Sequence, residues 1–193
     1  MKLFSRKGKP VRLETERFVL TTTSRRDIAR HSFPWTTDPE IMHPMGYGTK
    51  WTMRKWRRTY PRFNNRTRFC FAIRPKGNDT VIGYERITMD GHGNAILTVM
   101  IGDRGWWGKG TVQETRRAVI DFAFGTLGCA RLAGYVLESN YPSIANYQML
   151  GFQCEGVNRK LRRNLSGKGR LDMIIFSQLA EEWQALREKE RAS

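Results

Sequence analysis

The stretch 101–111 has the residue types and the spacing to bind a phosphate group. An apolar run over 95–101 leads into it, and a helical pattern follows it. Gly105, Gly108 and Gly110 lie between, and glycine permits positive φ angles and close approach by another molecule. A glycine-rich turn that opens a helix presents unpaired N–H groups at the positive end of the helix dipole, which favours phosphate or pyrophosphate. The same pattern also fits a strand-to-helix connection that binds no ligand.

Two common phosphate-binding motifs do not match this turn. A nucleoside-triphosphate loop requires Gly-Lys followed directly by Ser or Thr, whereas here Gly110 separates Lys109 from Thr111. A dinucleotide-binding turn requires a third glycine, and Gln113 stands at that position. The spacing therefore excludes both of these nucleotide sites.

A second motif lies over 140–152, where Asn140 can cap the start of a helix and Gly151 can end it. It follows the glycine turn after roughly thirty residues, a gap that holds one helix and one strand, as a βαβ unit requires. The two motifs are therefore expected to meet at adjacent parallel strands.

In this order the motifs resemble the signatures of the GCN5-related N-acetyltransferases (GNAT family). The Trp-Gly-Lys-Gly turn over 107–110, followed by Glu114, resembles their pyrophosphate-binding turn. The stretch 140–152 resembles their second signature, Asn-x-x-Ser/Ala followed by Tyr-x-x-Leu-Gly-Phe. The resemblance covers about residues 13–183 and is to the subgroup that modifies ribosomal-protein N-termini, polyamines and amino-sugars. One departure is Gly105, where the family often has Gln or Arg.

The resemblance implies an α/β fold with a mixed, mostly antiparallel sheet flanked by helices and splayed at the acetyl-CoA site. It implies transfer of an acetyl group from acetyl-CoA to a primary amine, without a metal ion. The acceptor is a protein N-terminus or an anionic small amine such as an amino-sugar, because a basic site repels polyamines. The residues assigned to the cofactor are Val99, Met100, Ile101, Arg104, Gly105, Trp107, Gly108, Lys109, Gly110, Thr111, Asn140, Ser143 and Tyr147.

Acetyl transfer to an amine needs a proton donor for the departing thiolate and a proton acceptor for the amine. Tyr147 matches the family's thiolate-protonating tyrosine, and a phenol with a pKa of ~10 is a protonated donor at neutral pH. The alternative for Tyr147 is a core aromatic residue, and for Asn140 a plain helix cap. Glu85 and Glu138 are candidate general bases, although a surface position or a water chain would also be consistent with the sequence.

The net charge of +16 favours anionic partners. CoA carries three phosphate groups, and the remaining excess is consistent with an acidic substrate, a ribosomal surface or simply a solvated exterior. The stretch 50–66 interleaves aromatic residues with cations and no acid, a pattern that can stack bases and bind phosphates. It also fits a lid helix that buries its aromatic face. The rival function is therefore a non-catalytic GNAT-fold module that binds nucleic acid or ribosome.

The composition argues against several other classes of protein. Three widely spaced cysteines (Cys70, Cys129 and Cys154) favour neither a disulfide framework nor a zinc site, and the histidines share no ligand spacing with them. No stretch approaches the ~20 apolar residues of a membrane span, and the N-terminus lacks the apolar region of a secretory signal. We expect a cytoplasmic protein, monomeric or homodimeric, that does not contact a membrane.

The remaining elements must hold the two motifs together. We expect a flexible basic tail over 1–12 and one N-acetyltransferase domain over 13–193. Alternating or β-branched runs predict strands over 13–21, 68–74, 80–89, 95–101, 131–138, 152–157 and 171–176, the last two flanking a basic hairpin over 159–170. Capping residues and apolar spacing predict helices from Ser24, over 49–62, 112–127, 140–151 and 180–191.

Overall fold

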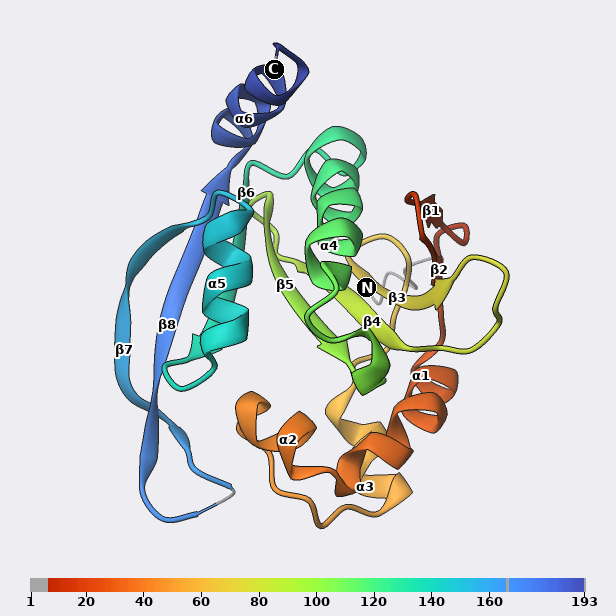
Figure 1. Cartoon of the computed structure of the whole chain (residues 1–193), viewed down its shortest axis with the longest axis vertical. Helices are drawn as coiled ribbons and strands as arrows, with labels where there is room; N and C mark the ends of the chain where they lie inside the picture. The colour runs from red at the N-terminus through yellow and green to blue at the C-terminus, as the bar shows by residue number, and fades with distance from the viewer. Residues whose placement is uncertain (1–6, 166, 193) are drawn as a thin grey trace, which may run out of the picture.

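The computed structural model describes residues 7–165 and 167–192, and its strands form one sheet (Figure 1). The sheet is 8-stranded in the order β1-β2-β3-β4-β5-β6-β8-β7. Neighbouring strands are antiparallel except β5 and β6, which confirms the predicted mixed, mostly antiparallel sheet. The strands are β1 (Arg12–Glu14), β2 (Phe18–Thr22), β3 (Arg68–Pro75), β4 (Gly83–Met89), β5 (Asn94–Ile101), β6 (Arg131–Leu137), β7 (Gln153–Arg163) and β8 (Arg170–Leu179).

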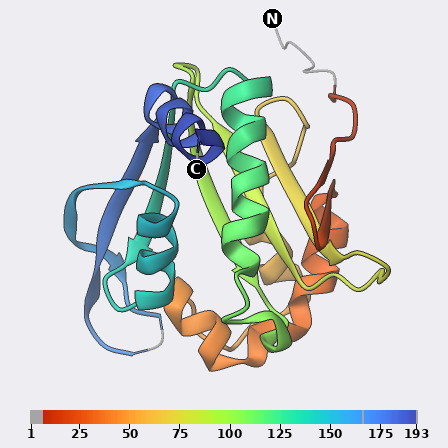
Figure 2. The ribbon, with the colours of Figure 1, turned by 45° about the horizontal axis from the view of Figure 1, so that its top comes forward.

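Two groups of helices flank this sheet (Figures 1 and 2). One group follows β2 and comprises α1 (Arg25–Ser32), η1 (Phe33–Thr37), α2 (Pro39–Met42), η2 (His43–Met45) and α3 (Met53–Thr59). The other comprises η3 (Arg104–Trp106), α4 (Thr111–Asp121), η4 (Phe122–Thr126), α5 (Tyr141–Met149) and α6 (Ala180–Ala192). None of the helices in the described part of the chain is long and apolar enough to cross a membrane.

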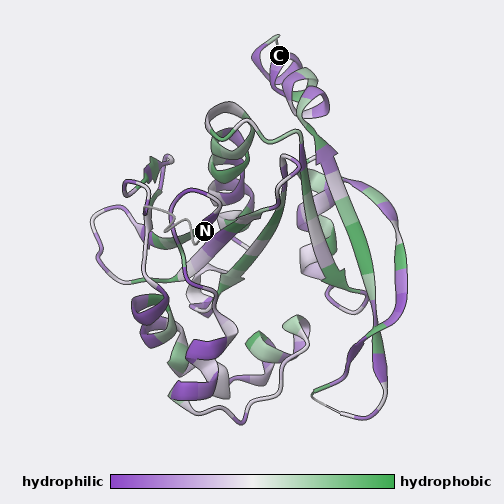
Figure 3. Cartoon of the chain, turned by 180° about the vertical axis from the view of Figure 1, so that it is seen from behind, coloured by the Kyte–Doolittle hydropathy of each residue, from purple (hydrophilic) through white to green (hydrophobic). Residues whose placement is uncertain are grey.

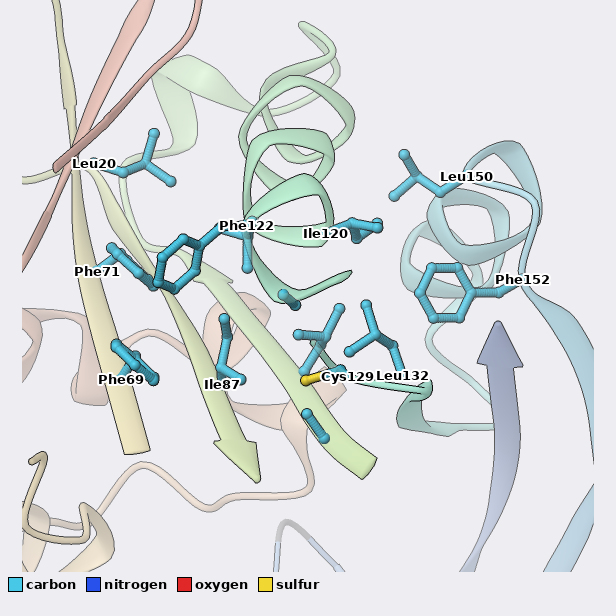
Figure 4. Packing of buried hydrophobic residues seen from close by; sticks show 14 of the residues in the cluster. Leu20, Phe69, Phe71, Ile87, Ile120, Phe122, Cys129, Leu132, Leu150 and Phe152 are labelled. Carbon is cyan, nitrogen blue, oxygen red and sulfur yellow. The ribbon is translucent and has the colours of Figure 1, made fainter. Parts of the chain in front are cut away.

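The larger core lies between the sheet and helices α4 and α5 (Figure 4), and Trp183 of α6 also belongs to it. Alternate residues of β3 and β4 supply Phe69, Phe71 and Ile87 to this core, because successive strand side chains point to opposite faces. Phe122 packs edge-on against both Phe69 and Phe71, with ring centroids 5.4 and 5.8 Å away. Ile120 of α4 belongs to the same core, so α4 is fixed over the middle of the sheet.

The opposite face of the sheet packs on α1, α2 and α3. Its core includes Trp56 of α3, Tyr60 just after it, and Tyr84 and Met100 from the strands. The indole N–H of Trp56 donates to the Ser32 hydroxyl at 2.8 Å, so the polar atom of this buried ring is satisfied. The small helices therefore form a packed second layer beside the end of the sheet where β5 meets the glycine turn.

The sheet separates between β5 and β6, as the resemblance implied. Only Asn94–Ile96 of β5 pair with Arg131–Ala133 of β6, among the residues that the structure describes. Beyond that point β5 stays paired with β4 through Ile101, and β6 stays paired with β8 through Leu137. The facing edges of the two strands therefore diverge while their outer edges remain in the sheet.

Several boundaries differ from those expected. Of the expected tail, residues 1–6 lie outside the described residues, but the Gly8 N–H donates to the Asn64 carbonyl and Val11 N–H to the Thr22 hydroxyl. Gly8 is thus bonded to the loop before β3 and Val11 to the end of β2, while the flexibility of the tail stays a prediction. The helix after the glycine turn is α-helical only to Asp121 and continues as the π-helical segment η4. The basic hairpin is an extension of β7 and β8. Hydrophobic and hydrophilic residues are interspersed along β7, whereas β8 has a continuous hydrophobic run over 173–176 (Figure 3).

Candidate active site

The divergence of β5 and β6 opens a cleft of about 220 Å³. Its walls come from both strands, from α5 and from the η2 segment, and the β7–β8 hairpin closes one side. Tyr135 of β6 and Ile96 of β5 line it and remain 45% and 41% exposed. An elongated ligand with apolar and amide groups would cover these side chains.

The cleft-facing edge of β5 carries backbone groups that the sheet does not use. The Leu97 carbonyl accepts a contact from Tyr147, and the Ile101 carbonyl accepts the Trp107 indole N–H at 2.9 Å, so both point away from β4. Successive residues of a strand alternate in direction, so the N–H and C=O of Val99 face the cleft as well. Met100 has the opposite orientation, with its carbonyl against Gly83 of β4 and its side chain buried among the small helices.

The glycine turn delivers the chain to the N-terminus of α4 beside this cleft. Gly108 and Gly110 have φ angles of +68° and +69°, which glycine adopts without strain. A side chain at Gly108 would meet nothing within 4 Å, so the backbone there is open to approach. Thr111, Val112 and Gln113 begin the helix, and the N–H groups of these first positions have no intrahelical acceptor. The turn thus presents unpaired N–H groups and an open glycine backbone, and its binding of an anion stays a prediction.

Other residues of the turn use their polar groups inside the protein. Arg104 donates to Asp38 at 2.9 and 2.6 Å and pairs with Glu40 at 2.5 Å, which ties the turn to α2. The Gly105 N–H donates to the Asp103 carboxylate, and the Thr111 hydroxyl donates to the Trp106 carbonyl. These polar groups stabilise the turn itself. The groups that remain open to a ligand are the N–H groups at the start of α4 and the backbone at Gly108.

Lys109 and Trp107 occupy the outer side of the turn. The Lys109 carbonyl accepts from Arg17, and its ammonium lies 5.8 Å from the centre of the Trp106 ring. The Trp107 side chain is 39% exposed and stands at the end of β5 through its bond to Ile101. The assignment of both side chains to the cofactor stays a prediction.

Asn140 caps α5 and also joins two walls of the cleft. Its side-chain oxygen accepts the Ser143 N–H at 3.2 Å, and its side-chain nitrogen donates to the Pro44 carbonyl at 3.0 Å. Both Asn140 and Ser143 line the cleft. The predicted helix cap is present, and the same residue fixes η2 to the start of α5.

Tyr147 lies at the base of the cleft, where β5 and β6 separate. Its ring stacks on Phe176 at 5.3 Å and packs edge-on against Phe152 at 5.0 Å. Its hydroxyl is 3.5 Å from the Leu97 carbonyl, at the limit of a hydrogen bond, so the proton remains available to a better acceptor. Burial raises the pKa of Tyr147 although Arg116 opposes the rise, so the phenol is protonated at neutral pH.

A glycine on β6 makes room for that hydroxyl. A Cβ atom at Gly134 would lie 1.9 Å from the Tyr147 hydroxyl oxygen and 2.2 Å from its ring. Any side chain at this position would displace the tyrosine. The sequence contained no signal for this contact, because Gly134 lies in an otherwise regular strand and its requirement comes from a helix that follows it.

Glu85 faces α4 rather than the cleft. Its carboxylate is fully buried and lies 3.4 Å from the Arg116 guanidinium, which is also buried. Burial raises the pKa of Glu85 to about 7, while Arg116 favours the ionised form. This pKa would suit a general base, but Glu85 does not line the cleft, whereas Arg116 does and stacks 4.7 Å over the Tyr147 ring. Glu85 is thus placed as the counter-ion of Arg116.

Glu138, the other candidate base, is exposed just beyond β6 and also does not line the cleft. Among the described residues, no carboxylate contributes to the cleft walls. Nor does any group of three or more His, Cys, Asp or Glu side chains in the described ranges have the geometry to hold a metal ion.

The aromatic residues of the cation-rich stretch 50–66 point mainly inward. Trp56 and Tyr60 are almost completely buried, whereas Arg54, Lys55 and Arg58 are exposed on the outer side of α3. Buried rings cannot stack on bases. The geometry therefore favours the packed helix over the nucleic-acid interpretation, and association with a ribosome or nucleic acid stays a prediction from net charge alone.

Comparison with known proteins finds sequence relatives of this chain. The family model for the acetyltransferase (GNAT) domain matches residues 17–153. The chain is 36% identical over 117 residues to an uncharacterized N-acetyltransferase, p20, of Bacillus licheniformis, covering 58% of this chain and 63% of that protein. It is 33% identical over 95 residues to a protein described as a probable N-acetyltransferase, YjcK, of Bacillus subtilis, covering 48% and 52%. The matches thus span less than two thirds of either curated relative.

Solved structures share the fold at lower sequence identity. A GCN5-related N-acetyltransferase from Brucella melitensis has a TM-score of 0.75 and 19% identity, covering 100% of this chain and 90% of that chain. A spermidine N-acetyltransferase from Vibrio cholerae, solved in complex with CoA and spermine, has a TM-score of 0.72 and 17% identity, covering 86% and 98%.

Substitution of Glu85 alone should destabilise the protein, and a second substitution at Arg116 should recover most of the loss. Glu85→Gln leaves the Arg116 charge buried without a counter-ion and should lower the free energy of unfolding by about 3–5 kcal/mol. Glu85→Leu combined with Arg116→Met removes both charges and should recover most of that loss. Urea denaturation at pH 8, where Glu85 is ionised, measures both. A double variant no more stable than Glu85→Gln would contradict the assigned pairing.

The contact between Gly134 and Tyr147 predicts a position-specific steric effect. Gly134→Ala places a methyl group against the tyrosine and should lower the free energy of unfolding by about 1–3 kcal/mol through overpacking. Gly125→Ala is the matched control, because a Cβ atom there meets nothing within 4 Å. Urea denaturation compares the two variants, and equal stability of both would show that β6 tolerates a side chain beside Tyr147.

Proposed function

The chain belongs to the GNAT acetyltransferase family, and we propose that it transfers the acetyl group of acetyl-CoA to a primary amine. The observation that carries the proposal is the meeting of three features in one place. Val99 of the unpaired β5 edge and Tyr147 line the cleft, and the open amides at the start of α4 precede Arg116, which lines the cleft from the same helix. Together they match the needs of a long thioester ligand with a diphosphate at one end.

The residues present fit the cofactor. The N–H groups of Thr111, Val112 and Gln113, with the open backbone at Gly108, would hold the pyrophosphate. The N–H and C=O of Val99 would pair with the amide groups of the pantetheine arm, and Ser143 lies on the opposite wall. When bound there, acetyl-CoA would supply the acetyl group as a thioester.

Tyr147 is the proposed proton donor to the departing thiolate. Its hydroxyl is protonated at neutral pH and only weakly held by Leu97. Arg116 lies over its ring and adds positive potential beside the position where negative charge develops. Backbone N–H groups of β5 would polarise the thioester carbonyl in the same way.

Among the described residues, no carboxylate lines the cleft to accept the proton of the amine. Since neither Glu85 nor Glu138 lines the cleft, we propose that the acceptor amine loses its proton to water. An α-amine, with a pKa of about 8, is already partly deprotonated at neutral pH and needs little help. The proposed acceptor is a protein N-terminus or an anionic small amine such as an amino-sugar nucleotide.

The acid role predicts a selective loss of turnover in Tyr147→Phe. Loss of a positioned general acid should lower kcat by about 10²-fold or more, while the Kd for acetyl-CoA changes little, because the ring packing is kept. Release of free thiol with a panel of amines measures turnover, and calorimetric titration measures binding. Tyr141→Phe, exposed on the same helix, is the control. Full turnover by Tyr147→Phe when chemistry limits the rate would remove Tyr147 from the mechanism.

A further inference from the structure

The side chains that line the cleft and are charged at neutral pH are all positive. Arginines contribute from three elements, Arg86 of β4, Arg116 of α4 and Arg162 of β7, and no acidic side chain among the described residues faces them across the cleft. Arg116 is paired with Glu85, as described above. Arg86 and Arg162 have no ion pair with any described residue, so their charges are not neutralised within the site.

Arg86 is held rigidly at the rear of the cleft. In the sheet register it stands between Cys70 of β3 and Thr98 of β5. Its guanidinium lies 5.6 Å from the centre of the Tyr60 ring and 5.7 Å from that of Tyr84. Its Nε is buried and has no hydrogen-bond partner. A buried donor of a charged group that lacks a partner is costly, and stacking on two rings offsets only part of that cost.

None of the groups that surround Arg86 supplies the missing negative charge. Burial raises the pKa of Tyr84 to about 12 and that of Tyr60 well above its usual range, so both phenols are neutral. Burial likewise raises the pKa of the Cys70 thiol to about 12. Arg86 is therefore a preorganised cation that faces neutral groups only.

Arg162 approaches the same cleft from the β7–β8 hairpin. Its guanidinium lies 5.6 Å from the centre of the Tyr47 ring, and both residues line the cleft. Tyr47 also packs on Trp56 at 6.0 Å, which connects this wall to the core of the small helices. Arg86 and Arg162 thus both line the cleft, and each guanidinium lies beside a tyrosine ring.

We propose that Arg86, assisted by Arg162, binds a carboxylate or phosphate group on a small acceptor amine and so determines acceptor specificity. The inference rests on the proposed function and adds the chemical class of the acceptor and the residue that recognises it. A guanidinium donates two parallel hydrogen bonds to either anion, which fixes the orientation of the acceptor as well as its charge. The cleft volume of about 220 Å³ favours a small molecule over a folded protein N-terminus.

The test compares amines with and without an anionic group. Glucosamine is paired with glucosamine 6-phosphate, and glycinamide with glycine, with a short neutral peptide as a further acceptor. Turnover is read by free-thiol release with acetyl-CoA. The variants are Arg86→Met and, as the control, Arg58→Met, which removes the same charge from an exposed position on α3.

The wild-type protein should use at least one anionic member with a kcat/KM about tenfold or more above its neutral partner. Arg86→Met should abolish that preference, with a larger loss of kcat/KM on the anionic member than on its neutral partner, whereas Arg58→Met should keep the preference. Equal use of both members by the wild type, preference for the neutral peptide, or an equal loss on both members in Arg86→Met would overturn the inference.

Direct binding separates this inference from the proposed function. Calorimetric titration of the protein with CoA present measures the affinity for glucosamine 6-phosphate and glycine whether or not turnover occurs. Absence of thiol release with every amine would contradict the proposed function, while binding of an anionic amine that Arg86→Met weakens about tenfold or more would still support the role of Arg86. Binding that is absent, or unchanged in Arg86→Met, would overturn that role.

Discussion

The separation of β5 from β6 is the constraint on which the site depends. Within the described part of the chain, these two parallel strands pair over only Asn94–Ile96 and Arg131–Ala133, which leaves the remaining backbone edge of β5 without partners in the sheet. Unpaired backbone groups are costly when buried, so such an edge persists only where solvent or a ligand can satisfy it. The sheet tolerates the gap because β4 and β8 hold the outer edges of the two strands.

Tyr147 and its neighbours occupy the base of the gap. The ring stacks between the core and Arg116, and Gly134 leaves the space for its hydroxyl. Arg116 is in turn held by Glu85 beneath α4. A buried ion pair contributes little net stability by itself, but it fixes the guanidinium at one position beside the reacting groups. The same packing that stabilises α4 on the sheet therefore sets the electrostatic potential at the base of the cleft.

The sequence predicted the elements more completely than their contacts. Glycine spacing and the apolar run before it located the turn, and Asn140 and Gly151 located α5, because caps and turns depend on local residue types. The roles of Gly134, Arg86 and Arg104 depend on residues distant in the sequence, and no local pattern contains them. Glu85 was a reasonable base by residue type, but strand alternation directs its side chain towards α4, while its neighbour Arg86 faces the cleft.

Hydrogen–deuterium exchange with and without CoA tests the central claim most directly. If the open edge of β5 and the start of α4 bind this ligand, protection should increase at the amides of Val99 and of Thr111 to Gln113. The amides of β3, which lie within the continuous part of the sheet, should change little in comparison. Binding of CoA without protection at Val99 and at the start of α4, or no binding at all, would contradict the account.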